Sequence, residues 1–220
     1  MDRRFAARGH GVTSCDHGPV VRAIVLAGGA SSRMGRPKAA LALSDSADTF
    51  LSRLIRTFTD AGIPDIVVVT GSTPAAVRAA AGRTRRQVRF VHNAQWANGQ
   101  LSSLLEGLGR RNEEVVEAAL VTLVDAPLVR VATVARLLKT WRQRHALMVR
   151  PARGEEHGHP VLFDRRLFDE LRAADPARGA KTVVRAHEAD IVNLPTDDPG
   201  AFLDIDTEQE YRDALRQLRR

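Results

Sequence analysis

Short apolar runs rich in valine and isoleucine alternate along this chain with longer stretches in which apolar residues recur at helical spacing. An uninterrupted apolar run is typical of a strand buried on both faces, and spacing of three to four residues is typical of a helix with one buried side. The predicted strands are residues 21–27, 66–70, 88–92, 120–124, 147–149, 161–163 and 191–194. The predicted helices are residues 49–61, 74–81, 101–108, 131–144, 166–174, 180–189 and 207–218.

Strands that alternate with helices predict an α/β fold with a mostly parallel sheet. The 220 residues fit one domain, which we assign to residues 20–220, and residues 1–19 are predicted to form a disordered arm. In open sheets of this kind, ligands bind beyond the carboxyl ends of the strands. Candidate site residues therefore follow the predicted strands, at Gly28, Gly71, residues 93–100, Asp125 and His159.

Composition narrows the class of protein. A hydrophobic fraction of 44% with 27% charged residues is ordinary for a soluble globular protein and excludes collagen-like, disulfide-rich and wholly disordered chains. The single cysteine, Cys15, excludes an internal disulfide and a paired-cysteine metal site. No apolar run is long enough to span a membrane, and residues 1–19 lack the apolar segment of a signal peptide. We therefore predict a cytoplasmic protein without a membrane partner.

The formal net charge of +7 at pH 7 raises the question of nucleic-acid binding. All but three of the 33 basic residues are arginines, and they are spread along the chain without interleaved aromatic residues for base stacking. We interpret most of them as solvated surface residues and predict no nucleic-acid partner. A basic balance also suits an enzyme whose substrates carry several phosphates.

A glycine-rich segment begins directly after the first predicted strand and extends from Gly28 to Lys38. Its backbone amides can converge on an anion, and glycine allows a phosphate to approach closely. Arg33 and Lys38 add two cations, which we expect to face solvent. The segment matches neither the Walker A pattern nor the dinucleotide pattern Gly-x-Gly-x-x-Gly. A flexible surface loop is the alternative, but the preceding strand and the two cations favour a phosphate-binding loop.

Two aspartates are candidate ligands for Mg²⁺. Asp125 follows an apolar strand, where a carboxylate is well placed to hold a hard cation, and the alternative is a cap on the next helix. Asp206, in the segment Asp204-Ile205-Asp206-Thr207, supplies a second carboxylate. Its alternative is stronger, because either Asp206 or Thr207 could cap the last predicted helix.

One histidine stands apart from the others by its position. His159 lies just before the predicted strand at 161–163, and His157 precedes it by two residues. Two histidines without a third convincing ligand do not favour zinc, so we interpret His159 as a half-exposed side chain that contacts an anionic or polar substrate. Trp96, in the polar segment at 93–100, is interpreted as a packing residue.

Together, these motifs resemble the nucleotidyltransferases that attach a nucleoside monophosphate to molybdopterin, and in particular their cytidylyltransferase-like branch. The resemblance covers about residues 21 to 218. The opening motif Leu26-Ala27-Gly28-Gly29 with Arg33-Met34-Gly35 and Lys38 is similar to the phosphate loop of that family. The remaining matches are His92-Asn93, residues 98–104, Gly158-His159-Pro160-Val161-Leu162, and Asp204-Ile205-Asp206-Thr207.

The resemblance implies a Rossmann-like three-layer fold of the nucleotide-diphospho-sugar transferase type and a Mg²⁺-dependent reaction. CMP from CTP would be transferred to a phosphorylated acceptor, molybdopterin, with release of pyrophosphate, and the product would serve a client molybdoenzyme. Arg33, Lys38 and Asp125 would be catalytic, Asp125 and Asp206 would bind the metal, and His159 would face the acceptor. The residues implied to bind nucleotide are Leu26, Ala27, Gly28, Gly29, Arg33, Lys38, Thr70, Gly71, Asn98, Gly99 and Ser102.

Two departures from the cytidylyltransferase pattern keep alternatives open. Gly28 stands where the guanine-using branch carries glycine, so GTP is the alternative donor, and we predict a preference for CTP with detectable use of GTP. Ala126 replaces the residue that usually follows the metal aspartate, which bears on acceptor contacts. Another phosphorylated metabolite is the alternative acceptor. A protein that binds nucleotide or cofactor without turnover is the alternative from another class.

Overall fold

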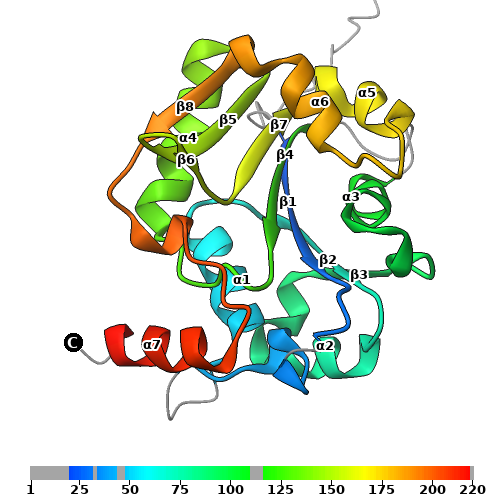
Figure 1. Ribbon diagram of the computed structural model, residues 1–220, viewed down its shortest axis with the longest axis vertical. Helices are drawn as coiled ribbons and strands as arrows, with labels where there is room; N and C mark the ends of the chain where they lie inside the picture. Colours follow the sequence, from blue (N-terminus) through cyan, green and yellow to red (C-terminus); the bar gives the residue numbers. More distant parts are fainter. Residues whose placement is uncertain (1–19, 32–33, 44–47, 110–115, 219–220) are drawn as a thin grey trace, which may run out of the picture.

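The computed structural model describes residues 20–31, 34–43, 48–109 and 116–218, and within them the fold is built on a single sheet (Figure 1). The strands are β1 Val20–Ala27, β2 Asp65–Thr70, β3 Arg89–His92, β4 Val116–Leu123, β5 Met148–Arg153, β6 Glu156–His157, β7 Val161–Asp164 and β8 Ile191–Pro195. Their order is β3-β2-β1-β4-β7-β5-β6, and β8 also pairs with β5. β1 and β4 therefore lie in the interior of the sheet.

Most strand pairs are parallel, as the sequence predicts. β1 pairs in parallel with both β2 and β4, β2 with β3, and β5 with β8. The exception is β7, which lies antiparallel between β4 and β5. The carboxyl ends of β1, β2 and β4 consequently meet at one edge of the sheet.

Helices cover both faces of the sheet and form three layers with it (Figure 1). α1 Phe50–Asp60, α2 Pro74–Ala80 and α4 Val131–Arg144 pack on one face, and α3 Gln100–Leu108, α5 Phe168–Ala173 and α6 Lys181–Ala186 pack on the other. In β1, Ala23 and Val25 face the first group, whereas Ile24 and Leu26 face the second. Alternate residues of a strand point to opposite faces, so a strand covered on both sides is mostly apolar, and the exception in β1, Arg22, forms an ion pair with Asp65.

The remaining helix, α7 Glu208–Leu218, packs outside these layers on the segment that follows the glycine loop. Tyr211 packs against Phe50, and its hydroxyl donates a hydrogen bond of 2.6 Å to the carbonyl of Ala42. No helix in the described residues is long and apolar enough to cross a membrane. The C-terminal segment is therefore fixed against the loop that carries Lys38.

The structure differs from the predicted elements mainly around β5 and β6 and in the helices α5 and α6. β5 continues to Arg153, beyond the predicted end at residue 149, and β6 was not predicted. Arg150 interrupts the apolar pattern, but its guanidinium is buried against Asn193 and Glu188. The predicted helix at 166–174 begins as a 3-10 turn before α5, and the one predicted at 180–189 ends at Ala186.

The junction between α4 and β7 yields a stability prediction. The indole Nε1 of Trp141 donates a 2.8 Å hydrogen bond to the carboxylate of Asp164, which also accepts from Arg166. Burial acts to raise the pKa of Asp164, but these hydrogen bonds outweigh it and lower the pKa. We expect Asp164→Asn to lower the free energy of unfolding by about 1–3 kcal/mol at pH 7.

The pH dependence of this contribution has a defined sign. A carboxylate with a lowered pKa stabilises the fold above its unfolded-state pKa, and the stabilisation is lost as the pH falls through the folded-state value. Urea unfolding at pH 7 and at acid pH measures it. The difference between wild type and Asp164→Asn should shrink as the pH falls, and a constant difference would contradict the assigned role of the charge.

Candidate active site

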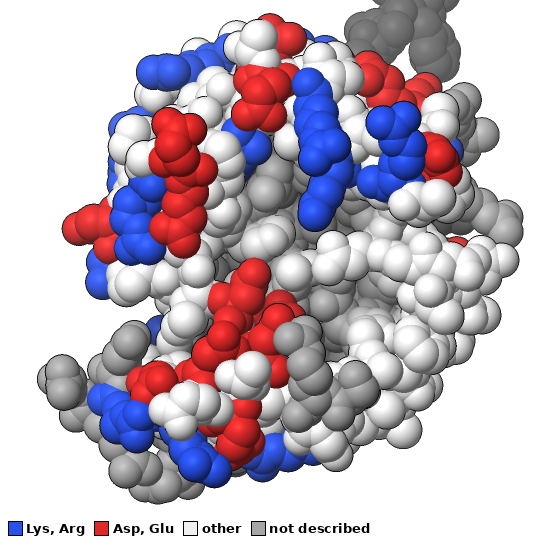
Figure 2. All heavy atoms as spheres, in the orientation of Figure 1, with Lys and Arg blue, Asp and Glu red and all other residues white. Residues whose placement is uncertain are grey.

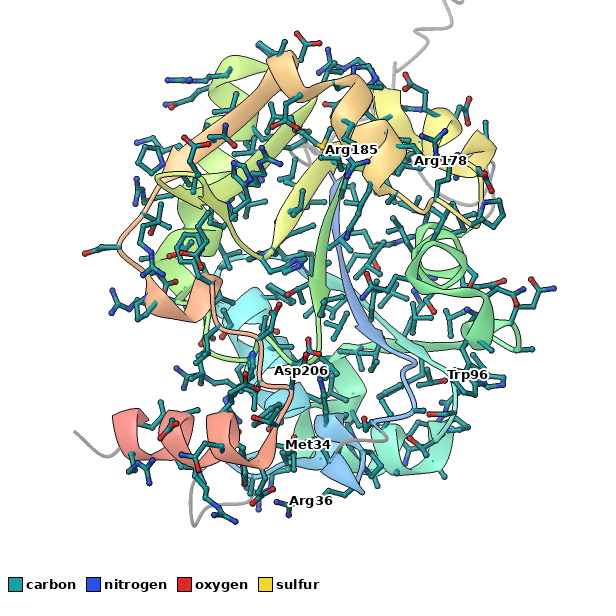
Figure 3. All side chains as sticks on the ribbon, viewed as in Figure 1. Met34, Arg36, Trp96, Arg178, Arg185 and Asp206 are labelled. Carbon is teal, nitrogen blue, oxygen red and sulfur yellow. The ribbon has the colours of Figure 1, made fainter. Side chains whose placement is uncertain are left out.

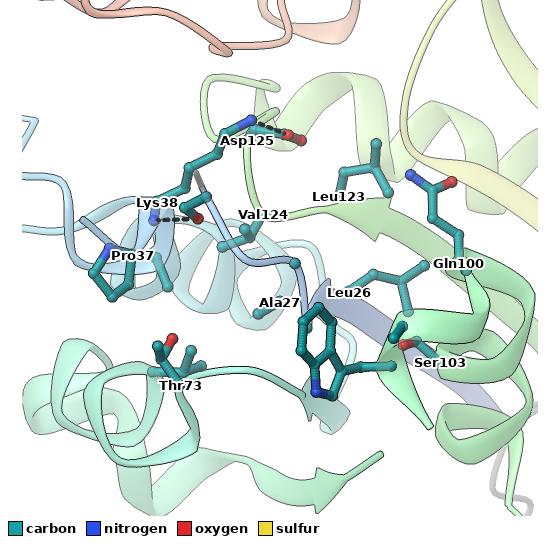
Figure 4. Close-up of a pocket in the computed structure, with 18 residues that line it drawn as sticks. Leu26, Ala27, Pro37, Lys38, Thr73, Gln100, Ser103, Leu123, Val124 and Asp125 are labelled. Carbon is teal, nitrogen blue, oxygen red and sulfur yellow. Dashed lines mark hydrogen bonds and ion pairs between the residues drawn. The ribbon is translucent and has the colours of Figure 1, made fainter. Parts of the chain in front are cut away.

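A cleft of about 360 Å³ opens at the carboxyl ends of β1 and β4, the edge where the sequence places its candidates (Figures 2 and 4). Its walls come from the loop after β1, the beginning of α2, the turn before α3 and the segment after β4. The predicted site residues that line it are Leu26, Ala27, Gly28, Gly29, Lys38, Gly99 and Asp125. Trp96, interpreted from the sequence as a packing residue, also lines it, as do Thr73 and Ser103, which are not among the predicted nucleotide contacts.

The glycine loop is held against the end of β2. The backbone N–H of Ser72 donates to the carbonyl of Gly28 at 3.1 Å, and the Ser72 hydroxyl donates to the carbonyl of Gly29 at 2.9 Å. A Cβ on Gly71 would lie 2.4 Å from the Gly28 carbonyl oxygen and 2.6 Å from the Cβ of Trp96. Only glycine permits this approach. A Cβ on Gly29, by contrast, would meet no heavy atom within 4 Å, so that side of the loop is open.

Lys38 lies between the two predicted metal ligands. Its ammonium donates to Asp125 Oδ2 at 2.7 Å and also to Asp206 Oδ1 (Figure 4 shows the first contact). The lysine side chain is only 12% exposed, which corrects the expectation that it faces solvent. Burial acts to lower its pKa, but the hydrogen bonds and charges of the two aspartates outweigh this effect and raise the pKa. The ammonium therefore keeps its charge inside the site.

At the starts of α4 and α7, the helix-cap contacts in the described residues come from side chains other than Asp125 and Asp206. The hydroxyl of Thr207 accepts from the backbone N–H of Glu210, whose carboxylate accepts from the N–H groups of Thr207 and Asp206. This reciprocal arrangement caps α7 without the Asp206 carboxylate. At the start of α4, Asp198 accepts from the Arg130 N–H at 2.8 Å. Thr207, one of the two residues that the capping alternative named, thus caps α7, and Asp198 rather than Asp125 binds the backbone at the start of α4.

Backbone contacts bring the two aspartates together. β4 ends at Leu123, and a turn follows in which the N–H of Ala126 donates to the Leu123 carbonyl at 3.3 Å. The carbonyl of Asp125 then accepts from the N–H of Ile205 at 2.9 Å, and the Ile205 side chain is fully buried. The segment before α7 is thereby fastened to the end of β4, beside the glycine loop.

The residues present fit a divalent metal. Asp125 Oδ1 is buried and has no hydrogen-bond partner in the described residues, so one oxygen remains to be satisfied. The described part of the chain holds no group of three or more His, Cys, Asp or Glu that could hold a metal. Mg²⁺ ordinarily takes one or two carboxylates and completes its shell with phosphate oxygens and water. Asp125 and Asp206 supply that number of carboxylates.

His159 interacts electrostatically with Asp204, next to the predicted metal ligands, but does not line the cleft. Its backbone N–H donates to the Ala201 carbonyl at 2.7 Å, and its Nδ1 is buried without a hydrogen-bond partner in the described residues. Burial raises the pKa of Asp204, the charge of His159 opposes this rise, and the charges of Asp125 and Asp206 add to it. The histidine therefore belongs to the same electrostatic cluster as the predicted metal ligands.

Other predicted nucleotide contacts organise the loops around the cleft. Thr70 is buried in the sheet, where its hydroxyl donates to the Val91 carbonyl at 3.2 Å. The Ser102 hydroxyl accepts a hydrogen bond from the Asn93 side-chain amide at 2.8 Å and donates one to the Gly99 carbonyl at 2.8 Å. Its neighbour Ser103 lines the cleft. Asn98 ends the short turn that carries Trp96 and does not line the cleft. Arg33 lies outside the described residues.

The model of the MobA-like NTP transferase domain matches residues 23–191, which include the glycine loop and Asp125. The chain belongs to this family. Its relatives include the probable molybdenum cofactor guanylyltransferase of Mycolicibacterium paratuberculosis, 30% identical over 89% of this chain and 95% of the relative. The nicotine blue oxidoreductase of Paenarthrobacter nicotinovorans is 31% identical over 88% of this chain and 96% of the relative. These names cover two reaction classes, so the reaction of this NTP transferase has to be argued from its site.

Solved structures support the same fold. The crystal structure of Rv0371c from Mycobacterium tuberculosis superposes with a TM-score of 0.74 at 27% identity, covering 90% of this chain and 98% of that one. A second crystal structure of Rv0371c, with a TM-score of 0.67, is a complex with manganese. The three-layer nucleotidyltransferase fold of this NTP transferase is thus confirmed.

Proposed function

We propose that this protein transfers a nucleoside monophosphate from a nucleoside triphosphate to a phosphorylated acceptor and releases pyrophosphate. The observation that carries the proposal is the meeting of Lys38, Asp125 and Asp206 beside a glycine loop, at the edge of the sheet where α/β enzymes bind nucleotides. A lysine and two carboxylates that could bind a metal, beside a glycine loop, suit a reaction in which the enzyme positions the phosphates and neutralises their charge.

In the proposed reaction, an oxygen of the acceptor phosphate attacks the α-phosphorus in line, and the bond to the leaving pyrophosphate breaks. No covalent bond to the enzyme forms. Asp125 and Asp206 would hold Mg²⁺, which neutralises triphosphate charge and stabilises the leaving group when bound. Gly28 and Gly29 allow the backbone to approach the phosphates, and Arg33 and Lys38 would contact them as cations.

An anionic acceptor is supported by basic side chains that lie outside the cleft lining, across the hollow from the carboxylates. Basic side chains border the hollow on one side and acidic side chains on the other, and Arg178 and Arg185 come from the segment around α6 (Figures 2 and 3). Both arginines are exposed, and neither forms an ion pair with a described residue. With His159 near the acidic side, we propose molybdopterin as the acceptor and a molybdoenzyme as the client of the product.

For the donor base we propose CTP as preferred, because most motifs resemble the cytidylyltransferase-like branch, and GTP as a usable alternative. Two observations support the use of GTP, the glycine at position 28 and the guanylyltransferase names of several relatives. Pyrophosphate release with each nucleotide, Mg²⁺ and molybdopterin tests the proposal. Release that requires all three components supports the transferase, whereas tight nucleotide binding without release supports a non-catalytic carrier.

A substitution at Gly28 tests the base preference. A Cβ there would lie 3.3 Å from the Ser103 hydroxyl and 3.6 Å from Gly71, so a methyl group fits after a small shift and narrows the cleft. We expect Gly28→Ala to raise the ratio of kcat/KM for CTP over GTP by about tenfold, the usual discrimination of one methyl group. Gly29→Ala, whose methyl enters open space, should leave the ratio unchanged. An unchanged ratio in Gly28→Ala would mean that the nucleotide base does not lie beside Gly28.

A further inference from the structure

The pairing of Lys38 with both aspartates has a consequence for how metal enters the site. The Lys38 ammonium donates to Asp125 Oδ2 and to Asp206, so it places a positive charge against the two carboxylates that a divalent cation would need. A metal on these carboxylates and the ammonium repel each other at close range, so each weakens the binding of the other. Metal and lysine therefore compete for the two carboxylates.

We propose that Lys38 is a placeholder cation that keeps metal affinity low until a nucleoside triphosphate arrives and takes the ammonium. Lys38 lines the cleft together with the glycine loop, so a triphosphate bound there would offer its ammonium new anionic partners. Once the lysine moves to the phosphates, its ammonium no longer competes with the metal for Asp125 and Asp206. This inference rests on the proposed function in one respect, namely that a nucleoside triphosphate is the ligand that takes the ammonium.

The charges of the site make this exchange reciprocal. Without a cation between them, Asp125 and Asp206 would repel each other, and Asp204 beside them already has a pKa raised first by burial. Lys38 holds the carboxylates in place before the substrate arrives. Because coupling between two ligands is reciprocal, nucleotide must strengthen metal binding by the same factor by which metal strengthens nucleotide binding. Without nucleotide, the metal would bind weakly, so the site would take up metal mainly together with its substrate.

The first test measures Mn²⁺ binding without nucleotide, by the loss of the electron paramagnetic resonance signal of free Mn²⁺. Lys38→Gln should bind Mn²⁺ about tenfold or more tightly than wild type, because a charge-assisted competitor has been removed. Lys139→Gln, which removes an exposed lysine on α4, should match wild type. The double variant Lys38→Gln/Asp125→Asn should lose the gain. Unchanged or weaker binding in Lys38→Gln overturns the inference.

The second test uses wild type and remains informative if Lys38→Gln does not fold. The chain has only three lysines, Lys38, Lys139 and Lys181, so ¹⁵N spectra of the lysine ammonium groups are simple to assign. We expect millimolar Mg²⁺ alone to leave the Lys38 signal in place, and Mg²⁺ with a non-hydrolysable CTP or GTP analogue to shift it. A full shift with Mg²⁺ alone overturns the inference.

These measurements separate the inference from the proposed reaction. Neither requires turnover, so tighter Mn²⁺ binding by Lys38→Gln supports the placeholder role even in a preparation that releases no pyrophosphate. Conversely, wild type could release pyrophosphate while Lys38→Gln binds Mn²⁺ no more tightly than wild type. That result would support the proposed function and overturn the placeholder role of Lys38.

Discussion

Asp125→Asn is expected to lower kcat for pyrophosphate release by about a hundredfold to a thousandfold, a larger effect than any other single substitution proposed for this site. The carboxylate follows a buried strand, its Oδ1 has no protein partner in the described residues, and its Oδ2 binds the Lys38 ammonium. Asparagine keeps the shape but removes the charge that would hold a metal. Steady-state kinetics over a range of Mg²⁺ concentrations measures the loss, which excess metal should not restore fully.

Two comparisons make this prediction specific. Asp206→Asn should cost less, about tenfold, because its side chain is 36% exposed against 17% for Asp125 and its charge is better screened by water. Asp197→Asn removes an exposed carboxylate outside the cleft and should leave kcat unchanged. Melting temperatures serve as the folding control, because the Asp125 backbone carbonyl continues to accept from Ile205 in the variant. Equal losses in Asp125→Asn and Asp197→Asn would contradict the metal assignment.

Gly71→Ala is expected to reduce kcat/KM by about a hundredfold, through the position of the glycine loop. A Cβ at this residue would lie 2.4 Å from the Gly28 carbonyl oxygen and 2.8 Å from the Gly28 Cα, and backbone cannot yield as a flexible side chain can. The loop must move away from β2, and displacement of a positioning element by about 1 Å can cost a hundredfold in rate. The same overpacking should lower stability by about 1–3 kcal/mol.

Gly29→Ala is the matched control, because its methyl group meets no atom within 4 Å. It should retain the wild-type melting temperature, whereas Gly71→Ala should melt lower. Nucleotide titrations by thermal shift separate binding from chemistry, since stabilisation by ligand depends on its affinity. If Gly71→Ala binds and turns over nucleotide as wild type does, the contact between the two loops does not set the geometry of the site.

Hydrophobic patterning predicted most strands and helices because it reports which residues are buried. β1 is apolar except for Arg22, which pairs with Asp65, since Ile24 and Val25 face helices on opposite sides of the sheet. The pattern could not predict that β7 lies antiparallel between β4 and β5, because pairing joins segments distant in the sequence. The pattern also predicted that β5 ends at residue 149, because Arg150 is charged. In the structure Arg150 is buried within the strand and forms an ion pair with Glu188.

By itself, the sequence determined which chemical groups this protein can use: a glycine loop after a strand, a lysine at its end and two aspartates beyond later elements. Only the tertiary structure decided what those groups touch. Lys38 was expected in solvent, yet it contacts Asp125 across 87 positions of sequence and Asp206 across 168. Local spacing carries no information about contacts over such separations, because sheet order and the docking of α7 bring these residues together.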